Sequence, residues 1–452
     1  MRDNKILFEL KVIHMPEEAP LIAPLENFIS DFNHYELNRE LFDLRDEHGV
    51  QWWDLVRYQV QLALCIERDI YGRPAAVAPH KRVRIQSFIR QALRLTRDAF
   101  RIHKRKIQHA RALVVSRRSL DYINDVTAAD TRNGRSTIFV NKNGDTQAPH
   151  VAITSQSIQF FIRLTYRMQR IPDEVERDAR QVADDLRSHF NSEVNIYGII
   201  AKKYQQELVS RWVWSFILDR ACGLERVLYV YDDTLKSLVL LARSRGIDTE
   251  EVQHAYMGRT HIAFSYPQLD GGLMTLPDKV IVTRDTGDIT YPVTHVFATT
   301  KTKPRVPVPR TIDVLIGSSP SRRQETAEVV ASLVGQGLRV ALKLHPSETK
   351  DTSAIVTQYS SEEIVIYAGE EDFCDLAWQT HVFIPVNATS TTAFEAAEMG
   401  ARVVLIDIGG VKKTAVTDGV ASARAGSMEA LPEVVHTQLR AAATEIIKKG
   451  RK

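Results

Sequence analysis

Residues 339–346 read RVALKLHP, and residues 381–400 read HVFIPVNATSTTAFEAAEMG. In each stretch a short apolar run stops abruptly. The first run ends at His345-Pro346, and the second ends at hydroxyl residues followed by a helical pattern that Gly400 is placed to end. A short apolar run bounded by such signals is typical of a buried parallel strand. The two stretches therefore predict two strands of one parallel α/β sheet.

The same alternation continues on both sides of these stretches. It predicts strands at 312–316, 339–344, 364–367, 382–386 and 402–406, with helices between them at 323–334, 352–359, 372–379 and 391–399. Parallel strands joined by helices make a Rossmann-like domain. We place this domain at residues 310–435.

An earlier part of the chain repeats the pattern less regularly. Strands are predicted at 112–116, 137–140, 226–231, 250–254 and 279–283, with a helix at 235–245 and a largely helical stretch at 155–220. This predicts a second Rossmann-like domain at 112–300, with a helical N-terminal region at 1–111 before it. A Thr- and Pro-rich linker at 299–309 separates the two domains. The expected fold class is α/β, with two Rossmann-like domains that face a cleft.

Composition narrows the class of protein. The 452 residues are 44% hydrophobic and 25% charged, with a formal net charge of +3. These proportions exclude a mostly disordered chain, a collagen-like fibre and a disulfide-rich mini-protein, and they give no reason to expect nucleic acid as a partner. The three cysteines lack metal or disulfide spacing, and neither a signal-peptide pattern nor an apolar run of about 18 residues occurs. We therefore expect a cytoplasmic protein.

Two strands of the C-terminal domain end in loops suited to an anion. Gly317, Ser318 and Ser319 follow the first strand, where small residues let backbone N–H groups approach a ligand beside a helix N-terminus. A plain turn between a strand and a helix has the same composition. His345 and Pro346 follow the second strand, where an imidazole can donate a proton or a hydrogen bond to a leaving phosphate. An ordinary loop histidine is the alternative.

A third loop places four hydroxyl residues at a helix start. They are Thr389, Ser390, Thr391 and Thr392, although capping needs only one of them. The further hydroxyls, the free N–H groups and the helix dipole together suit a phosphate. Glu395, one turn into the helix, is expected either to accept hydrogen bonds from ribose hydroxyls or to be a carboxylate on the helix surface.

The combination of these motifs is more specific than each alone. His345-Pro346 with Ser390-Thr391-Thr392 and the following Ala-x-Glu-Ala-x-x-x-Gly resembles a group of bacterial GT-B glycosyltransferases of capsule and lipopolysaccharide synthesis, the polysialyltransferase-like and Kdo-transferase-like enzymes. In that group the two motifs bind the phosphate of the nucleotide donor, which implies the same role here. The resemblance covers residues 311–410.

The N-terminal half supports this resemblance more loosely. Residues 251–254 read EVQH, 261–267 read HIAFSYP and 276–278 read LPD, similar to the Glu-x-Gln-His-Gly and Leu-Pro-Asp stretches of such enzymes. Ala255 stands where glycine is usual. Residues 53–57, WDLVR, also resemble a stretch of surface-polysaccharide transferases, but no role follows from it.

The resemblance implies an inverting glycosyltransferase. It would move a sugar from a nucleotide-activated donor, with a CMP-sugar as one candidate, to a surface-glycan or lipid-linked glycan acceptor. Such a reaction needs a base, charge stabilisation at the leaving phosphate and a cleft that excludes water. The candidate bases of the N-terminal domain are Asp232, Asp233, Glu251 and His254. The sequence contains no Asp-x-Asp pair and no convincing zinc spacing, so we expect neither a metal nor a cofactor.

Other functions stay open on sequence grounds. A polyol-phosphate transferase of the teichoic-acid type shares the two-domain shape and the His-Pro loop, although its serine loop usually carries an acid that residues 387–390 lack. A sugar-nucleotide 2-epimerase would carry Asp-Ser-Gly-Gly where residues 389–392 read TSTT, and a dinucleotide oxidoreductase would carry G-x-G-x-x-G. A non-catalytic scaffold for glycan assembly is a candidate from a different class.

Basic charge is concentrated in one predicted helix. Residues 81–111 contain eleven Lys or Arg against one acid, Asp98, a formal charge of +10. We expect this helix to bind the anionic inner face of the cell membrane, as a peripheral contact. The alternative is a helix whose apolar stripe packs on its own domain. No nucleic-acid-binding motif accompanies the charge. One face of the helix is marked by Arg90, Arg94, Arg97 and Arg101.

Overall fold

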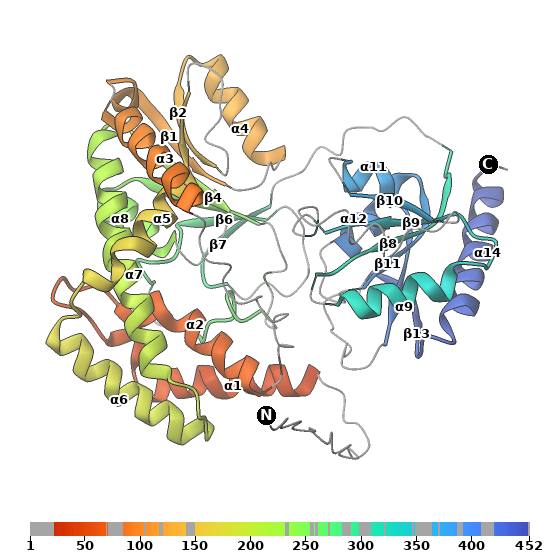
Figure 1. Cartoon of the computed structure of the whole chain (residues 1–452), viewed down its shortest axis with the longest axis horizontal. Helices are drawn as coiled ribbons and strands as arrows, with labels where there is room; N and C mark the ends of the chain where they lie inside the picture. Colours follow the sequence, from red (N-terminus) through yellow and green to blue (C-terminus); the bar gives the residue numbers. More distant parts are fainter. Residues whose placement is uncertain are drawn as a thin grey trace, which may run out of the picture.

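The computed structural model of the chain contains two parallel sheets, and each sheet is formed by one half of the sequence (Figure 1). This agrees with the two regions of alternating sequence pattern. The structure describes residues 22–68, 70, 85–103, 105–116, 121–141, 150–230, 235–253, 257, 261–269, 272–282, 291–297, 309–320, 322–345, 348, 364–368, 371–386, 392–407 and 420–450.

The N-terminal sheet has the strand order β3-β2-β1-β4-β5-β6-β7, and each neighbouring pair is parallel. The order reverses between β1 and β4, as in a doubly wound Rossmann sheet. The sequence pattern does not predict β3 and β7, which read VAIT and THVF. The strands are β1 (Ala110–Val115), β2 (Ser136–Asn141), β3 (Val151–Thr154), β4 (Arg226–Val230), β5 (Asp248–Val252), β6 (Lys279–Val282) and β7 (Thr294–Phe297).

Helices cover both faces of this sheet. On one face, the apolar side chains of four helices share a core with Leu113 and Val227. On the other face, Ile123 packs with Val114 and Leu228. Leu113 and Val114 are neighbours in β1 that point into different layers, which is why these strands need continuous apolar sequence. The first face is covered by α3 (Ile85–His103), α5 (Ser155–Thr165), α7 (Ile196–Arg220) and α8 (Lys236–Ser244), and the second by α4 (Asp121–Arg132).

A helical region lies beside the N-terminal sheet (Figure 1). Its core contains the fully buried Trp52 and Trp53, packed with Phe32 and Phe190. The expected helical N-terminal region is thereby confirmed, but α3 packs on the sheet instead, because its Ile102 belongs to the sheet core. The helices of the region are α1 (Ile22–Asn38), η1 (Leu41–Asp43), α2 (Trp52–Glu67), α6 (Asp173–Phe190) and the first half of α7.

The C-terminal sheet has the order β10-β9-β8-β11-β12-β13, again with parallel neighbours throughout. Renumbered within the domain, this order is 3-2-1-4-5-6, that of a doubly wound sheet. The α/β fold class with two Rossmann-like domains is therefore confirmed. The strands are β8 (Ile312–Gly317), β9 (Val340–Lys343), β10 (Ile364–Tyr367), β11 (Thr380–Pro385), β12 (Arg402–Ile406) and β13 (Ala421–Ala425).

Helices also cover both faces of this second sheet. On one face lie α9 (Arg323–Leu333) and α14 (Leu431–Gly450), and on the other lie α11 (Phe373–Trp378) and α12 (Thr392–Glu398). The sequence pattern does not predict β13 or α14, and α14 continues past the expected domain end at residue 435. The predicted helix at 352–359 and most of the predicted linker lie outside the described residues. Within the described part of the chain, no helix is both long and apolar enough to cross a bilayer.

Candidate functional site

The strand order of the C-terminal sheet reverses between β8 and β11. In doubly wound sheets, ligands bind beyond the carboxyl ends of the strands at this point. Gly317 ends β8 and Pro385 ends β11, and the N–H of Val386 donates a 3.1 Å hydrogen bond to the carbonyl of Gly317. The loops that follow these two strands therefore start side by side, at the position where the fold favours a ligand.

Gly317 is needed here because the two strands approach closely. A Cβ atom on Gly317 would lie 3.0 Å from Cζ of Phe383 and 4.0 Å from the carbonyl oxygen of Ile384. Phe383 is fully buried in β11, so its ring cannot move away without opening the core. The glycine at the end of β8 thus follows from packing at the reversal point.

Ser318 and His345 are joined through a buried carboxylate. The backbone N–H of His345 donates hydrogen bonds to Oγ of Ser318 (2.8 Å) and to Oε2 of Glu348 (3.2 Å). The Ser318 hydroxyl donates a short hydrogen bond to the same carboxylate oxygen, and the N–H of Glu348 donates to the His345 carbonyl at 2.8 Å. Glu348 is 2% exposed, whereas His345 is exposed. The loop after β9 is thus fixed to the loop after β8.

Two arginines lie at the start of α9, separated from the Gly-Ser-Ser loop by two residues: Arg322 is the N-cap and Arg323 is the first residue of the helix. Burial lowers the pKa of the half-buried Arg322, and Glu325, 3.5 Å away, offsets this only in part. Nε of Arg323 lies 3.6 Å from Oε1 of Glu348. An anion would stabilise a half-buried guanidinium, and the N–H groups at a helix start favour one as well. The sequence predicts no role for Arg322, Arg323 or Glu348, because their grouping depends on how the turns fold.

The structure describes part of the predicted donor site. Buried Ser319 and exposed His345 lie at the carboxyl edge of the sheet with Gly317 and Ser318. Thr392 begins α12 after β11, and Glu395 lies in the first turn of this helix. Gly400 ends the helix with a left-handed φ of 77°, as its position in the sequence predicts. The other predicted members, which lie outside the described residues, are Pro346, Thr389, Ser390 and Thr391.

Three of the four candidate bases, Asp232, Asp233 and His254, also lie outside the described residues. In the sequence they follow the ends of β4 and β5. The end of β4 is next to β1, where the order of the N-terminal sheet reverses. These three residues therefore stay predictions.

The fourth candidate base, Glu251, is fully buried in β5. Its Oε2 accepts hydrogen bonds from the hydroxyls of Tyr229 (3.2 Å) and Tyr291 (3.3 Å), and its buried Oε1 has no hydrogen-bond partner among the described residues. Burial raises the pKa of Glu251 to about 8, against the opposing effects of the two tyrosines and Lys236. At neutral pH the carboxyl is mostly protonated and enclosed, which does not suit the role of general base.

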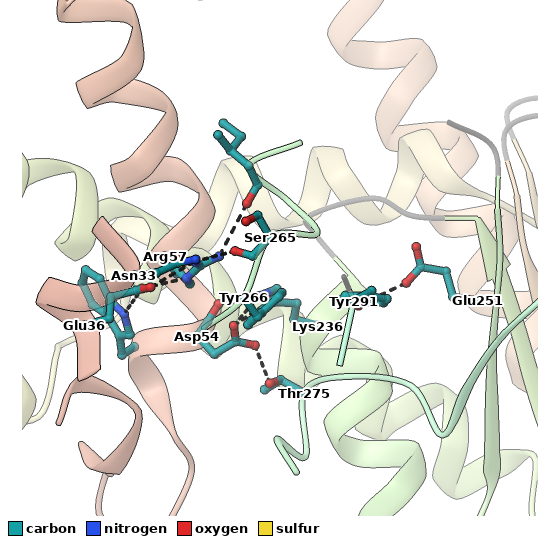
Figure 2. A network of polar contacts seen from close by, with 12 residues as sticks. Asn33, Glu36, Asp54, Arg57, Lys236, Glu251, Ser265, Tyr266, Thr275 and Tyr291 are labelled. Carbon is teal, nitrogen blue, oxygen red and sulfur yellow. Dashed lines mark hydrogen bonds and ion pairs between the residues drawn. The ribbon is translucent and has the colours of Figure 1, made fainter. Parts of the chain in front are cut away.

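The 53–57 stretch forms a buried polar network between α2 and distant loops (Figure 2). Asp54, fully buried, lies 2.8 Å from Nζ of Lys236 and accepts hydrogen bonds from the hydroxyls of Tyr266 (2.9 Å) and Thr275 (2.5 Å). Burial would raise the pKa of Asp54, but Lys236, the Thr275 hydroxyl and Arg57 together outweigh this, so the pKa lies below its usual value. Asp54 thus holds α2 to α8 and to the 266–275 segment.

Arg57 makes the second half of this network. Its guanidinium donates to both carboxylate oxygens of Glu36 (2.7 and 2.9 Å) and to the carbonyl of Ser265 (2.8 Å), and it lies 4.5 Å from the ring centre of Tyr266. Burial would lower the pKa of Arg57, but the attraction of Glu36 and other nearby groups outweighs this, so the pKa lies above its usual value and the guanidinium stays charged. Burial raises the pKa of Glu36, against the opposing effect of Arg57. The WDLVR stretch therefore positions the segment that follows β5, and in the described structure its role is structural.

His261 is the one histidine of the resembling N-terminal stretches that the structure describes. Burial lowers its pKa to about 4, so the ring is neutral. Its Nδ1 accepts a 3.2 Å hydrogen bond from the N–H of Ala263. The ring is thus held within its own turn, next to the segment that Arg57 fixes.

Comparison with known proteins gives only distant likenesses. No family model matches the chain, and no curated protein matches it. Among solved structures it resembles sucrose-phosphate synthase from Thermosynechococcus elongatus (13% identity, TM-score 0.39, 74% of this chain and 90% of that one). It also resembles Acinetobacter baumannii MurG, with 11% identity and a TM-score of 0.35 over 74% of this chain and 94% of that one. A third similar structure is UDP-GlcNAc 2-epimerase from Methanocaldococcus jannaschii, with 10% identity and a TM-score of 0.40 over 74% of this chain and 91% of that one. The fold class rests on the two strand orders themselves.

Proposed function

We propose that the chain is a GT-B glycosyltransferase that takes a sugar from a nucleotide donor bound at the carboxyl edge of the C-terminal sheet. One observation carries this proposal. At the reversal point between β8 and β11, the Ser318 and His345 loops are fastened together by Glu348, beside the half-buried Arg322. The loop that carries the His345 imidazole is thereby held in place, with the cation Arg322 at the start of α9, at the position where doubly wound sheets bind ligands.

In this mechanism, the C-terminal domain stabilises the leaving phosphate. Small residues at 317–319 let the backbone approach the phosphate, and the imidazole of His345 donates a hydrogen bond or proton to it as the glycosidic carbon–oxygen bond breaks. Arg322 and the start of α12, with Thr392, add positive charge and N–H donors. We propose that Glu395, in the first turn of α12, accepts hydrogen bonds from ribose hydroxyls. Glu348 acts through His345 and Ser318 as a positioning residue.

The N-terminal domain supplies the acceptor side. We propose Asp232, Asp233 or His254 as the base that takes the acceptor hydroxyl proton, with attack on the face opposite the leaving phosphate and inversion at the sugar carbon. Glu251 is left out because it is enclosed and mostly protonated at neutral pH. We further propose a surface-glycan or lipid-linked acceptor, a CMP-sugar as one donor candidate, and transfer without a metal, since the sequence has no Asp-x-Asp pair.

A nucleotide-binding panel tests the donor site directly. Thermal shifts would be measured with CMP, CDP, UDP, GDP and their sugar conjugates, since a bound ligand stabilises the folded protein by mass action. We expect one nucleotide class to raise the melting temperature, and His345→Ala to lower transfer from the matching donor by about 10²–10³-fold.

His109, exposed at the end of η2 (Arg105–His109) and outside the site, provides a matched control as His109→Ala. Near-normal transfer by His345→Ala, or no stabilisation by any nucleotide, would contradict the proposal. The second result would favour a non-catalytic scaffold.

A further inference from the structure

Large apolar side chains are exposed together on three neighbouring helices of the N-terminal domain. Leu93 of α3 is 65% exposed, Leu164 of α5 is 53% exposed and Trp212 of α7 is 60% exposed. Met168, in the short helix η3 (Tyr166–Met168) after α5, is 80% exposed. We call this surface the α3/α5/α7 face. The three helices lie on the left of the molecule in Figure 1, with the C-terminal domain on the right.

Side-chain contacts join the three helices into one surface. Nη1 of Arg94 on α3 donates a 2.7 Å hydrogen bond to Oε1 of Gln156 on α5. Further along α5, the ring of Phe161 stacks on Trp212 of α7 at 5.4 Å between centroids, and Trp212 stacks on Phe216 at 6.1 Å. The exposed indole is therefore part of a continuous aromatic layer and is held in place by it.

The charge that α3, α5 and η3 contribute to this face is basic. Residues 155–168, which form α5 and η3, contain Arg163 and Arg167 and no Asp or Glu. The one acid of α3, Asp98, is 1% exposed and accepts hydrogen bonds from the N–H of Thr154 (2.9 Å) and the hydroxyl of Ser157 (2.8 Å). Among their described residues, α3, α5 and η3 thus expose no acid. The exposed acid of α7, Asp219, is paired with Arg245 at 2.7 Å.

The orientation of α3 determines which of its side chains contact its own domain and which lie at the surface. Asp98 and Ile102 point inward, so the inward side is not the one that holds Leu93. Arg97 donates to Oγ1 of Thr154 and Arg101 donates to the carbonyl of Ala152, each at 3.0 Å. The helix therefore packs on its own domain through a polar contact, and it leaves an apolar residue beside a row of fixed arginines at the surface.

We propose that the α3/α5/α7 face docks on an anionic lipid bilayer, with Trp212, Leu164 and Met168 inserted at the headgroup boundary and the arginines on lipid phosphates. Trp combines an apolar body with a polar N–H, which suits the boundary between acyl chains and headgroups. An anionic bilayer complements the arginines that α3, α5 and η3 place around these apolar residues, whereas protein interfaces commonly have a rim of mixed charge. The inference does not depend on the transferase proposal.

Vesicle sedimentation with the full chain tests this inference. The vesicles contain phosphatidylcholine alone or with phosphatidylglycerol, at low and physiological salt. We expect binding only to anionic vesicles, weakened by salt, and lowered at least about tenfold in partition coefficient by Leu164→Ser with Trp212→Ser. These residues are exposed, so the melting temperature should hardly change. Phe297→Ser and Val365→Ser, at residues 60% and 56% exposed on β7 and β10, are the matched controls and should bind as the wild type does.

Tryptophan fluorescence places the contact. With brominated lipids we expect quenching that Trp212→Phe abolishes, because Trp52, Trp53 and Trp214 are buried and Trp378 packs against a core of the C-terminal domain. Equal binding of the Leu164/Trp212 variant and the controls would overturn the inference, as would the absence of binding to anionic vesicles at low salt. Concentration-dependent self-association that Trp212→Ser removes would assign the face to a second copy of the chain instead. Thermal shifts with nucleotides are also measured on the Leu164/Trp212 variant. They test the donor site independently of vesicle binding, so a failure of the membrane inference is distinguished from a failure of the donor site.

Discussion

At the scale of single residues, Glu348 accounts for the geometry of the proposed donor site. Its buried carboxylate accepts hydrogen bonds from the Ser318 hydroxyl and from the N–H of His345. Glu348→Ala leaves both donors and Arg323 without this partner, so we expect a loss of about 2–4 kcal/mol in the stability of the C-terminal domain. We also expect at least about a tenfold rise in nucleotide Kd.

Glu348→Gln, which keeps an acceptor oxygen, should recover much of both losses. The matched control is Glu328→Gln, an exposed α9 carboxylate that pairs with Gln324. Both variants are measured by calorimetry and nucleotide titration. Unchanged nucleotide affinity in the Glu348→Ala variant would show that the carboxylate does not position the loops.

Glu251 predicts a pH dependence of stability. Its pKa of about 8 in the folded state lies above the unfolded value of about 4.5, so the folded state holds the extra proton. The resulting stabilisation is complete below about pH 4.5 and is lost as the pH rises towards 8. Glu251→Gln should match the wild type near pH 5 and exceed it by up to about 4 kcal/mol at pH 9.

Denaturant unfolding at several pH values between 5 and 9 measures this difference. A constant difference across the range would be incompatible with a raised pKa. Transfer by Glu251→Gln at pH 7 is expected to stay within about threefold of the wild type. A loss of 10²-fold or more would return Glu251 to the candidate bases.

At the scale of elements, Asp98 determines how α3 docks. It caps the start of α5 from a neighbouring helix, through the N–H of Thr154 and the hydroxyl of Ser157. Asp98→Ala should lower the stability of the N-terminal domain by about 2–4 kcal/mol, because two buried donors lose their acceptor. Arg94→Gln, which removes an exposed contact on the same helix, should cost less than about 1 kcal/mol. Equal melting temperatures for the two variants would rule out this account of α3.

The same elements show what sequence pattern can and cannot predict. Strands such as β8 and β11 are predicted because each is a six-residue, largely apolar segment bounded by turn residues. β13 reads ASARA and has no apolar run, so its place at the sheet edge is set by pairing with β12. The apolar stripe of α3 does not indicate which side is buried, because a hydrogen-bonded carboxylate, Asp98, occupies the inward side. Where polar contacts determine the packing of a helix, the period of its apolar residues does not show which side is buried.

At the scale of the whole molecule, the sequence predicts the carboxyl edge of the C-terminal sheet as a site but not how that edge is held. Ser318 and His345 are recognised because parallel strands bring their ends together. Glu348 and Arg322 are not recognised, because their contacts arise from turns between elements. The WDLVR stretch is a further case, since Asp54 and Arg57 contact residues about 200 positions away in the chain. Contacts between residues so far apart in the chain leave no pattern in the neighbouring sequence.

The distribution of the cores leads to a last prediction. Each apolar core of the described residues lies within one half of the chain, either up to Tyr291 or from Ile312 onward. Calorimetry should therefore resolve two unfolding transitions, one lowered by Asp98→Ala and the other by Glu348→Ala. A donor nucleotide at 100 times its Kd stabilises the domain that binds it by about 2.7 kcal/mol. For a domain of this size that corresponds to roughly 5–10 °C, and we expect it in the Glu348-sensitive transition alone. A nucleotide that raised the Asp98-sensitive transition instead would place the donor in the N-terminal domain and reverse the assignment of the two halves.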